Sequence, residues 1–240
     1  VCFSDPDQGK KSAEYIADNG LAKKIAIIYD SSSEYSDGIR ESFVAEAPNQ
    51  GLEVVASEAF TSDNNTDFSV QLDKAKDAGA ELVFLPIYYT EASIILTQAD
   101  SMGFETKFFG CDGMDGILGV ENFDTSLAEG LMLLTPFAAD STDEKTQNFV
   151  KAYKDAYKDT PNQFAADAYD CVYAYKAALE ASGATADMSA EELCDKMIEA
   201  FPTLTYDGLT GTGITWDSTG AVSKTPKGMV IKNGAYVGME

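Results

Sequence analysis

Three short stretches of the sequence place a carboxylate or an aromatic ring directly after an apolar run of residues. They are Asp30 to Tyr35, Tyr88 to Glu91 and Cys111 to Gly113. If the apolar runs are parallel strands, all three stretches open on the edge of the sheet where such folds bind ligands. A carboxylate between aromatic rings can hold a small ammonium ion, because the charge is paired and the rings offer cation–π faces. Asp112, Tyr35 and Tyr88 therefore form a candidate ligand site.

Asp112 also has a simpler interpretation. Asp-Gly is a common turn dipeptide, so the carboxylate of Asp112 can serve the local backbone alone. Ordinary packing is likewise the simpler explanation for Tyr35 or Tyr88 when each is taken singly. Both interpretations stay open on the pattern.

Catalysis and metal binding find little support in the sequence. There is no histidine, no G-x-S-x-G motif and no P-loop, so general acid–base chemistry lacks its usual side chain. Cys111 beside Asp112 is a candidate nucleophile, but without histidine its thiol lacks the usual activating base. We therefore expect no enzyme activity, no catalytic residue, no metal site and no cofactor.

The four cysteines, Cys2, Cys111, Cys171 and Cys194, show no C-x-x-C spacing. Buried free thiols are the simpler expectation. The alternative is one disulfide between Cys171 and Cys194, which lie on neighbouring predicted helices, in an oxidising compartment.

Acidic residues outnumber basic ones by 40 to 17, which gives the 240-residue chain a net charge of −23. A field of this sign repels nucleic acids and anionic membrane surfaces, so we expect no nucleic-acid partner. The charges are scattered, which is typical of a solvated acidic surface; attraction of a cationic solute is the alternative. No apolar run is long enough to span a bilayer.

The elements that must position the candidate site alternate between two patterns. Short apolar runs typical of buried strands occur at 25–29, 54–56, 82–85, 108–109 and 131–134. Segments of helical period lie between them, at 39–47, 68–78 and 92–102. The alternation predicts an α/β fold, in which a parallel sheet carries helices on both faces.

The pattern changes after residue 134. Two capping boxes, at 141–144 and 189–192, and a helical stretch at 164–181 predict three helices without strands. From Tyr206 the chain returns to β character, with turns at 217–220 and at Asn233-Gly234, and we expect these strands to edge the sheet.

Several segments, in this order and spacing, resemble the branched-chain amino-acid type of periplasmic binding protein, the type I receptors of ABC importers. The resemblance covers essentially the whole chain. Its segments are Phe3 to Gly9, Ile25 to Asp30, Tyr35 to Gly38, Phe109 to Gly113, Ala128 to Gly130, Phe164 to Asp170 and Tyr206 to Gly211.

The resemblance implies two Rossmann-like lobes, joined by three crossing segments, that close on a ligand by a hinge. It implies that 1–136 and 205–240 form lobe II, and that 137–204 is the helical return segment of lobe I. About 120 residues at the start of the family's first lobe have no counterpart here, so the chain is expected to be truncated at its N-terminus.

The resemblance also implies roles for single residues. Tyr35 and Tyr88 match the ligand-facing tyrosines of lobe II, Asp112 stands where an acidic residue holds the ligand ammonium, and Phe164 matches an aromatic residue that approaches from lobe I. The family usually has glutamate at the position of Asp112, which has the shorter reach. The groups that hold the ligand carboxylate belong to the part without a counterpart.

The function implied is capture of an amino acid or a similar small molecule outside the cytoplasm, in the periplasm or on a lipid-anchored protein, for an ABC permease. A sensory receptor ectodomain of the same fold is the alternative, while a sugar-responsive repressor is disfavoured by acidity and a hydrolase ranks third. We also expect the fragment to self-associate, because its lobe I helices expose apolar faces.

Overall fold

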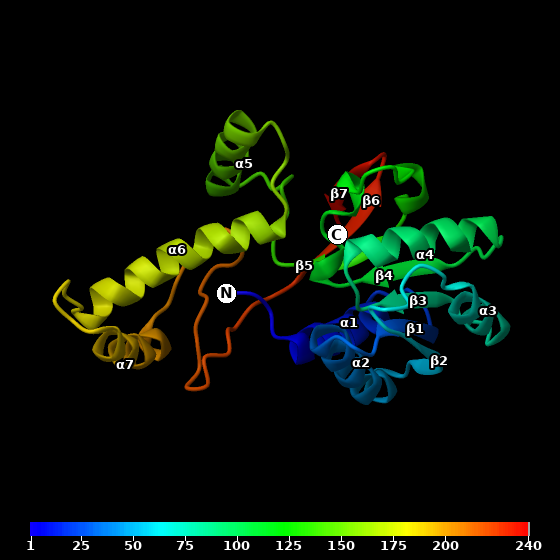
Figure 1. Ribbon diagram of the computed structural model, residues 1–240, viewed down its shortest axis with the longest axis horizontal. Coiled ribbons are helices and arrows are strands. Elements are labelled where there is room, and N and C mark those ends of the chain that lie inside the picture. Colours follow the sequence, from blue (N-terminus) through cyan, green and yellow to red (C-terminus); the bar gives the residue numbers. More distant parts are fainter. Residues whose placement is uncertain (240) are drawn as a thin grey trace. The chain divides into compact units, whose positions relative to one another are not determined.

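The computed structural model describes residues 1–239, which form two compact units. The first, here called the sheet unit, contains Asp5–Ala138 and the chain from Pro226 onward. The second, the helical unit, contains Val1–Ser4 and Ala139–Thr225. The chain therefore passes between the units three times (Figure 1).

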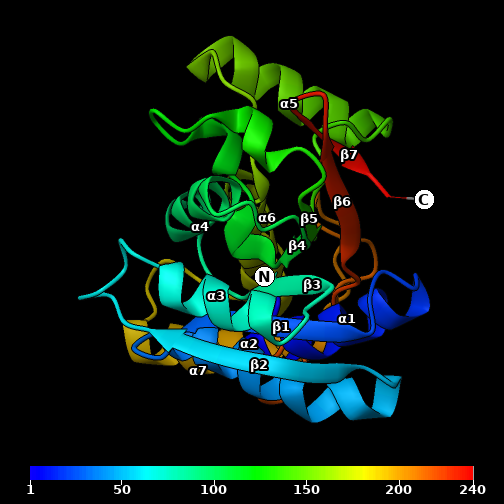
Figure 2. The ribbon, with the colours of Figure 1, turned by 90° about the vertical axis from the view of Figure 1, so that its right-hand side faces the viewer.

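The sheet unit is built on a seven-stranded sheet with the order β2-β1-β3-β4-β5-β6-β7. Its first five strands are parallel, as predicted, and the last two are antiparallel. Figure 2 shows β6 and β7 continuing the sheet beside β5. The strands are β1 (Lys24–Asp30), β2 (Glu53–Phe60), β3 (Leu82–Leu85), β4 (Lys107–Gly110), β5 (Met132–Thr135), β6 (Lys227–Lys232) and β7 (Ala235–Gly238).

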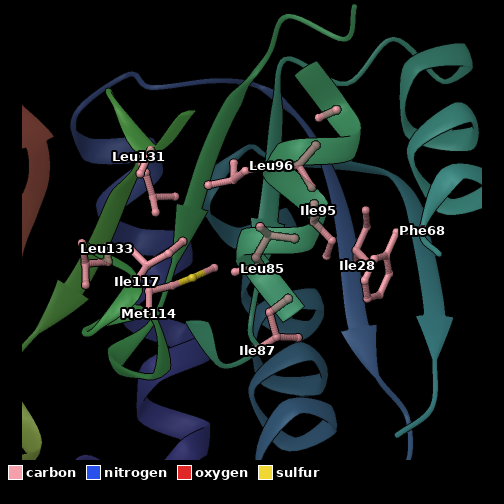
Figure 3. Packing of buried hydrophobic residues seen from close by; sticks show 14 of the residues in the cluster. Ile28, Phe68, Leu85, Ile87, Ile95, Leu96, Met114, Ile117, Leu131 and Leu133 are labelled. Atoms are coloured by element: carbon pink, nitrogen blue, oxygen red, sulfur yellow. The ribbon is translucent and has the colours of Figure 1, made fainter. Parts of the chain in front are cut away.

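Four helices cover the two faces of this sheet: α1 (Asp5–Asp18), α2 (Glu34–Glu46), α3 (Ser69–Asp77) and α4 (Tyr89–Ser101). Helices α1 and α2 pack on the face that carries Ile25 and Ile27, and α3 and α4 pack on the face that carries Ile28 (Figure 1). Neighbouring strand residues point to opposite faces, so a fully apolar run is needed where both faces are covered. Figure 3 shows Ile28, Phe68, Leu85 and Ile95 in the core under α3 and α4.

Short 3₁₀ helices complete the units: η1 (Ala47–Gln50), η2 (Asp112–Met114), η3 (Ile117–Gly119), η4 (Thr125–Ala128) and η5 (Phe201–Thr203). In the described part of the chain, no helix combines the length and apolar character needed to cross a bilayer.

The helical unit contains the three predicted helices: α5 (Glu144–Tyr157), α6 (Gln163–Ser182) and α7 (Ala190–Ala200). The capping box that opens α7 is present between Ser189 and Glu192. The box predicted at 141–144 was wrong, because Asp143 caps α5 by accepting from the Thr146 N–H, and Ser141 donates its hydroxyl to that same carboxylate. A carboxylate is the stronger acceptor and stands directly before the helix.

Residues 205–225 belong to the helical unit and not to the sheet, which differs from the predicted division; Val1–Ser4 likewise group with the helices. The reason is packing, because Ile214 and Trp216 are buried against Ala174 of α6. Of the segment after Tyr206, β6 and β7, joined at Asn233-Gly234 as predicted, extend the sheet beyond β5.

Two carboxylates one turn apart on α6 fasten this returning segment. Asp170, fully buried, accepts hydrogen bonds from the N–H groups of Leu209 and Thr210, both at 2.8 Å. Asp167 pairs with Lys224 at 2.8 Å, and both side chains are almost wholly buried. The helical unit is therefore held together by buried polar contacts as well as by apolar packing.

Candidate functional site

The three candidate residues of the sheet unit lie at the carboxyl ends of parallel strands. Tyr35 stands in the first turn of α2 after β1, Tyr88 is the N-cap of α4 after β3, and Asp112 begins η2 after β4. Phe164, the second residue of α6, is 38% exposed and belongs to the helical unit. The sheet unit therefore supplies three of the four candidate residues.

The structure brings Tyr35, Tyr88 and Asp112 together. The Tyr35 hydroxyl donates to Asp112 Oδ1 at 2.7 Å, and the two tyrosine rings are stacked with centroids 4.8 Å apart. The Gly113 N–H donates to the Tyr35 oxygen at 3.1 Å. A Cβ atom on Gly113 would stand 2.7 Å from that oxygen, so glycine is what allows this approach.

Asp112 takes part in a turn and also in a contact that is distant in sequence. Its carbonyl oxygen accepts from the Asp115 N–H in the 3₁₀ turn, while its carboxylate accepts from a tyrosine 77 positions away. The residue is only 6% exposed. A purely local turn role does not account for this carboxylate, since the Tyr35 bond is not part of the turn.

Burial and the neighbouring negative charge of Asp112 raise the pKa of Tyr35 well above its ordinary value of 10.0. The hydroxyl therefore stays protonated at neutral pH and remains a donor. Tyr35 donates to one oxygen of the Asp112 carboxylate, and the Tyr88 ring stacks on the Tyr35 ring, with Tyr88 47% exposed to solvent.

Alkaline titration should identify Tyr35 among the last tyrosines to ionise. The folded-state pKa of Tyr35 lies above its ordinary value of 10.0. The hydrogen bond of its protonated hydroxyl therefore stabilises the fold fully below pH 10.0, and this stabilisation is lost as the pH rises through the folded-state pKa. Near-ultraviolet phenolate absorbance measures this, and Tyr35→Phe should remove one phenol from the late fraction. Loss of a phenol from the early fraction instead would contradict the assigned hydrogen bond.

A residue that the sequence interpretation missed supports the site from α1. The backbone N–H of Asp112 donates to Gln8 Oε1 at 3.2 Å, and Gln8 is 5% exposed. The only sequence signal was that Gln8 lies within the segment Phe3 to Gly9 that carried the family resemblance.

Cys111, next to Asp112, is fully buried, and burial raises the pKa of its thiol. A thiol of this kind is a poor nucleophile, so the geometry does not support the catalytic alternative. All four cysteines are free; Cys111 alone is buried, Cys171 is partly exposed, and Cys2 and Cys194 are exposed. Within residues 1–239, no three cysteine, aspartate or glutamate side chains converge as metal ligands.

Comparison with protein families matches residues 2–235 to the periplasmic binding protein family. A Leu/Ile/Val-binding protein homolog of Brucella melitensis is 31% identical over 216 residues, covering 86% of this chain and 56% of that protein. A leucine-, isoleucine-, valine-, threonine- and alanine-binding protein of Pseudomonas aeruginosa is 26% identical over 207 residues, 86% of this chain and 52% of that protein. The chain spans about half the length of these curated relatives.

Solved structures agree with this match. A leucine-binding protein from Thermotoga maritima superposes with a TM-score of 0.86 at 26% identity, covering 100% of this chain and 66% of that one. A branched-chain amino-acid transporter substrate-binding protein from Streptococcus pneumoniae, in complex with isoleucine, gives a TM-score of 0.82 at 30% identity, with 99% and 66% covered. The fold is that of type I periplasmic binding proteins.

Proposed function

Because the chain belongs to the periplasmic binding protein family, we propose that it captures an amino acid, or a similar small molecule, for import by an ABC transporter. The observation that carries this proposal is the cluster of Tyr35, Tyr88 and Asp112 at the carboxyl edge of the sheet. This edge is where open parallel sheets bind ligands.

The cluster has the chemistry for an ammonium group. Asp112 supplies a carboxylate that Tyr35 orients at 2.7 Å, and the stacked ring of Tyr88 supplies an aromatic face. Phe164 of the helical unit is proposed as a further residue that contacts the ligand. An aspartate reaches less far than a glutamate, so the ammonium has to come closer to the backbone of the 112–114 turn.

The names of the relatives favour an aliphatic side chain on the ligand. The Brucella relative is described as a homolog of Leu/Ile/Val-binding proteins, and the pneumococcal relative is in complex with isoleucine. We therefore propose leucine, isoleucine or valine as the first ligands to test.

The proposal includes a place and a partner. We propose that the protein works outside the cytoplasm, in the periplasm or on a lipid anchor. We propose that it delivers its ligand to a membrane permease, and that it needs no cofactor and catalyses no reaction. We also propose that the sheet unit corresponds to lobe II of the family and the helical unit to part of lobe I.

A thermal-shift screen of the chain against the amino acids, small aromatic acids and sugars tests the ligand class. At a ligand concentration about one hundred times Kd, binding adds about 2.7 kcal/mol to the free energy of unfolding. A shift with leucine, isoleucine or valine supports the proposal. A response only to sugars or aromatic acids would retain the fold and overturn the ligand.

The proposal also predicts self-association of this chain. One face of α6 is apolar and open to solvent at successive helical positions, with Phe164 at 38%, Val172 at 67%, Tyr175 at 59% and Leu179 at 37% exposure. We expect sedimentation velocity to show a weight-average mass that rises with protein concentration, and Val172→Glu to suppress the rise. A monomer at every concentration would contradict this prediction.

A further inference from the structure

Helix α1 presents two buried polar side chains to the loop that carries Asp112. Gln8 and Ser12 lie one turn apart on α1 and are 5% and 0% exposed. Gln8 Oε1 accepts the Asp112 N–H at 3.2 Å, and the Ser12 hydroxyl lies 3.7 Å from Cys111 Sγ. The same face of α1 therefore touches two consecutive residues of this loop.

The Gln8 contact satisfies a donor at the start of a short helix. Asp112 is the first residue of η2, and the residue before it, Cys111, makes no side-chain capping bond. The first N–H groups of a helix have no partner within the helix, and a buried donor without a partner is costly. Gln8 supplies the acceptor from 104 positions away.

Helix α1 is also fixed against α2, which carries Tyr35. A Cβ atom on Gly9 would overlap the Ile39 carbonyl oxygen and lie 2.8 Å from the Phe43 nitrogen, so the two helix backbones are in direct contact. Gln8 thus contacts the 3₁₀ helix that carries Asp112, and Gly9 contacts α2, the helix that carries Tyr35. The Tyr35 hydroxyl then meets the Asp112 carboxylate.

We propose that Gln8 is a positioning residue of the ligand site: it holds the backbone of Asp112 so that the carboxylate keeps its direction toward Tyr35 and the bound ammonium. This inference rests on the proposed function. Gln8 lies four positions after Ser4, where the chain first passes between the two units. The contact therefore joins the ligand site to the segment that enters the sheet unit.

Three variants of the whole chain test the role. Gln8→Met has a similar length but no acceptor, Gln8→Glu keeps an acceptor oxygen, and Ser12→Ala is the matched control on the same face of α1, since Ser12 contacts Cys111 and not Asp112. Calorimetry with L-leucine measures affinity. Hydrogen exchange of the Asp112 amide, followed by NMR without ligand, measures the contact itself.

We expect Gln8→Met to weaken leucine affinity about tenfold and to speed exchange of the Asp112 amide by at least about tenfold, the effect of one lost hydrogen bond. Gln8→Glu keeps an acceptor but adds a carboxylate beside Asp112, so it is read by exchange alone, and its Asp112 amide should exchange within about threefold of the parent rate. Ser12→Ala should match the parent in both measurements. If Gln8→Met does not fold, Gln8→Asn, which is one methylene shorter, replaces it with the same expectation.

Two results would overturn the inference. One is an unchanged exchange rate of the Asp112 amide in Gln8→Met, which would show that Gln8 does not hold this amide, whether or not leucine binds. The other is an equal loss of leucine affinity in Gln8→Met and Ser12→Ala. This result would show that the loss comes from the packing of α1 and not from the hydrogen bond of Gln8. If the parent chain binds no amino acid while the exchange rates respond as expected, the positioning contact stands and the proposed function fails.

Discussion

Replacement of Asp112 by alanine should abolish the rise in melting temperature that a bound amino acid causes. Asp112 is 6% exposed and is oriented by the Tyr35 hydroxyl, so the proposed ion pair with the ligand would form in a poorly solvated place. Removing one partner of a buried, hydrogen-bonded charge pair costs about 2–5 kcal/mol of binding free energy. A loss of this size lowers affinity by about thirtyfold to several thousandfold.

One further variant separates the charge of Asp112 from its shape, and a second is a control elsewhere in the sheet unit. Asp112→Asn keeps the volume and an acceptor for Tyr35 but removes the charge, so we expect it to lose nearly as much stabilisation as the alanine variant. Asp73→Ala removes an exposed carboxylate from α3 of the same unit and should leave the ligand-induced shift unchanged. An unchanged shift in Asp112→Ala would disprove the role of Asp112.

Replacement of Asp170 by alanine should cause the largest loss of stability in the helical unit. The fully buried carboxylate accepts from two backbone N–H groups and from the Thr210 hydroxyl at 2.7 Å, and the Tyr206 hydroxyl lies 3.2 Å away. Without it, several buried donors lose their acceptor at once, and each costs about 1–3 kcal/mol. We expect the free energy of unfolding to fall by about 3–5 kcal/mol, measured by urea titration followed by circular dichroism.

The control for Asp170 is Asp187→Ala, which removes an exposed carboxylate of the same unit and should change stability by less than about 0.5 kcal/mol. Asp170→Asn keeps one acceptor oxygen and should fall between the two. Equal stabilities for the Asp170 and Asp187 variants would show that the network around Asp170 does not hold the returning segment.

Much of the sheet unit was predictable because its central strands β1, β3 and β5 are largely buried on both faces. A strand such as β3 must be apolar at every position, and such a run stands out in the sequence. Helix α1 was missed because its apolar residues are few and a glycine stands in its second turn. That glycine marks a close helix contact, which only the three-dimensional structure reveals.

The division of the chain was predicted less well, because β propensity says nothing about which core a strand joins. Residues 205–225 carry glycines and β-type residues, yet Ile214 and Trp216 pack on α6. The buried Asp170 that receives this segment also lies far from it in sequence.

The candidate site was predictable in part. The rule that ligands gather at the carboxyl ends of parallel strands selected three loops, and the structure brings Tyr35, Tyr88 and Asp112 from these loops into one cluster. Gln8 was not predictable from residue chemistry, because a glutamine in an amphipathic helix resembles an ordinary surface residue. The roles of these residues and of Phe164 in ligand binding stay predictions.

The most direct test of the central claim, recognition of an ammonium group by Asp112, is a calorimetric comparison of L-leucine with 4-methylpentanoate. The two compounds share the side chain and the carboxylate, and only leucine carries the ammonium group. We predict saturable binding of leucine and no detectable binding of the analogue, because the buried carboxylate would be left without its counter-charge. Equal binding of the two compounds, or binding of neither, would contradict the account.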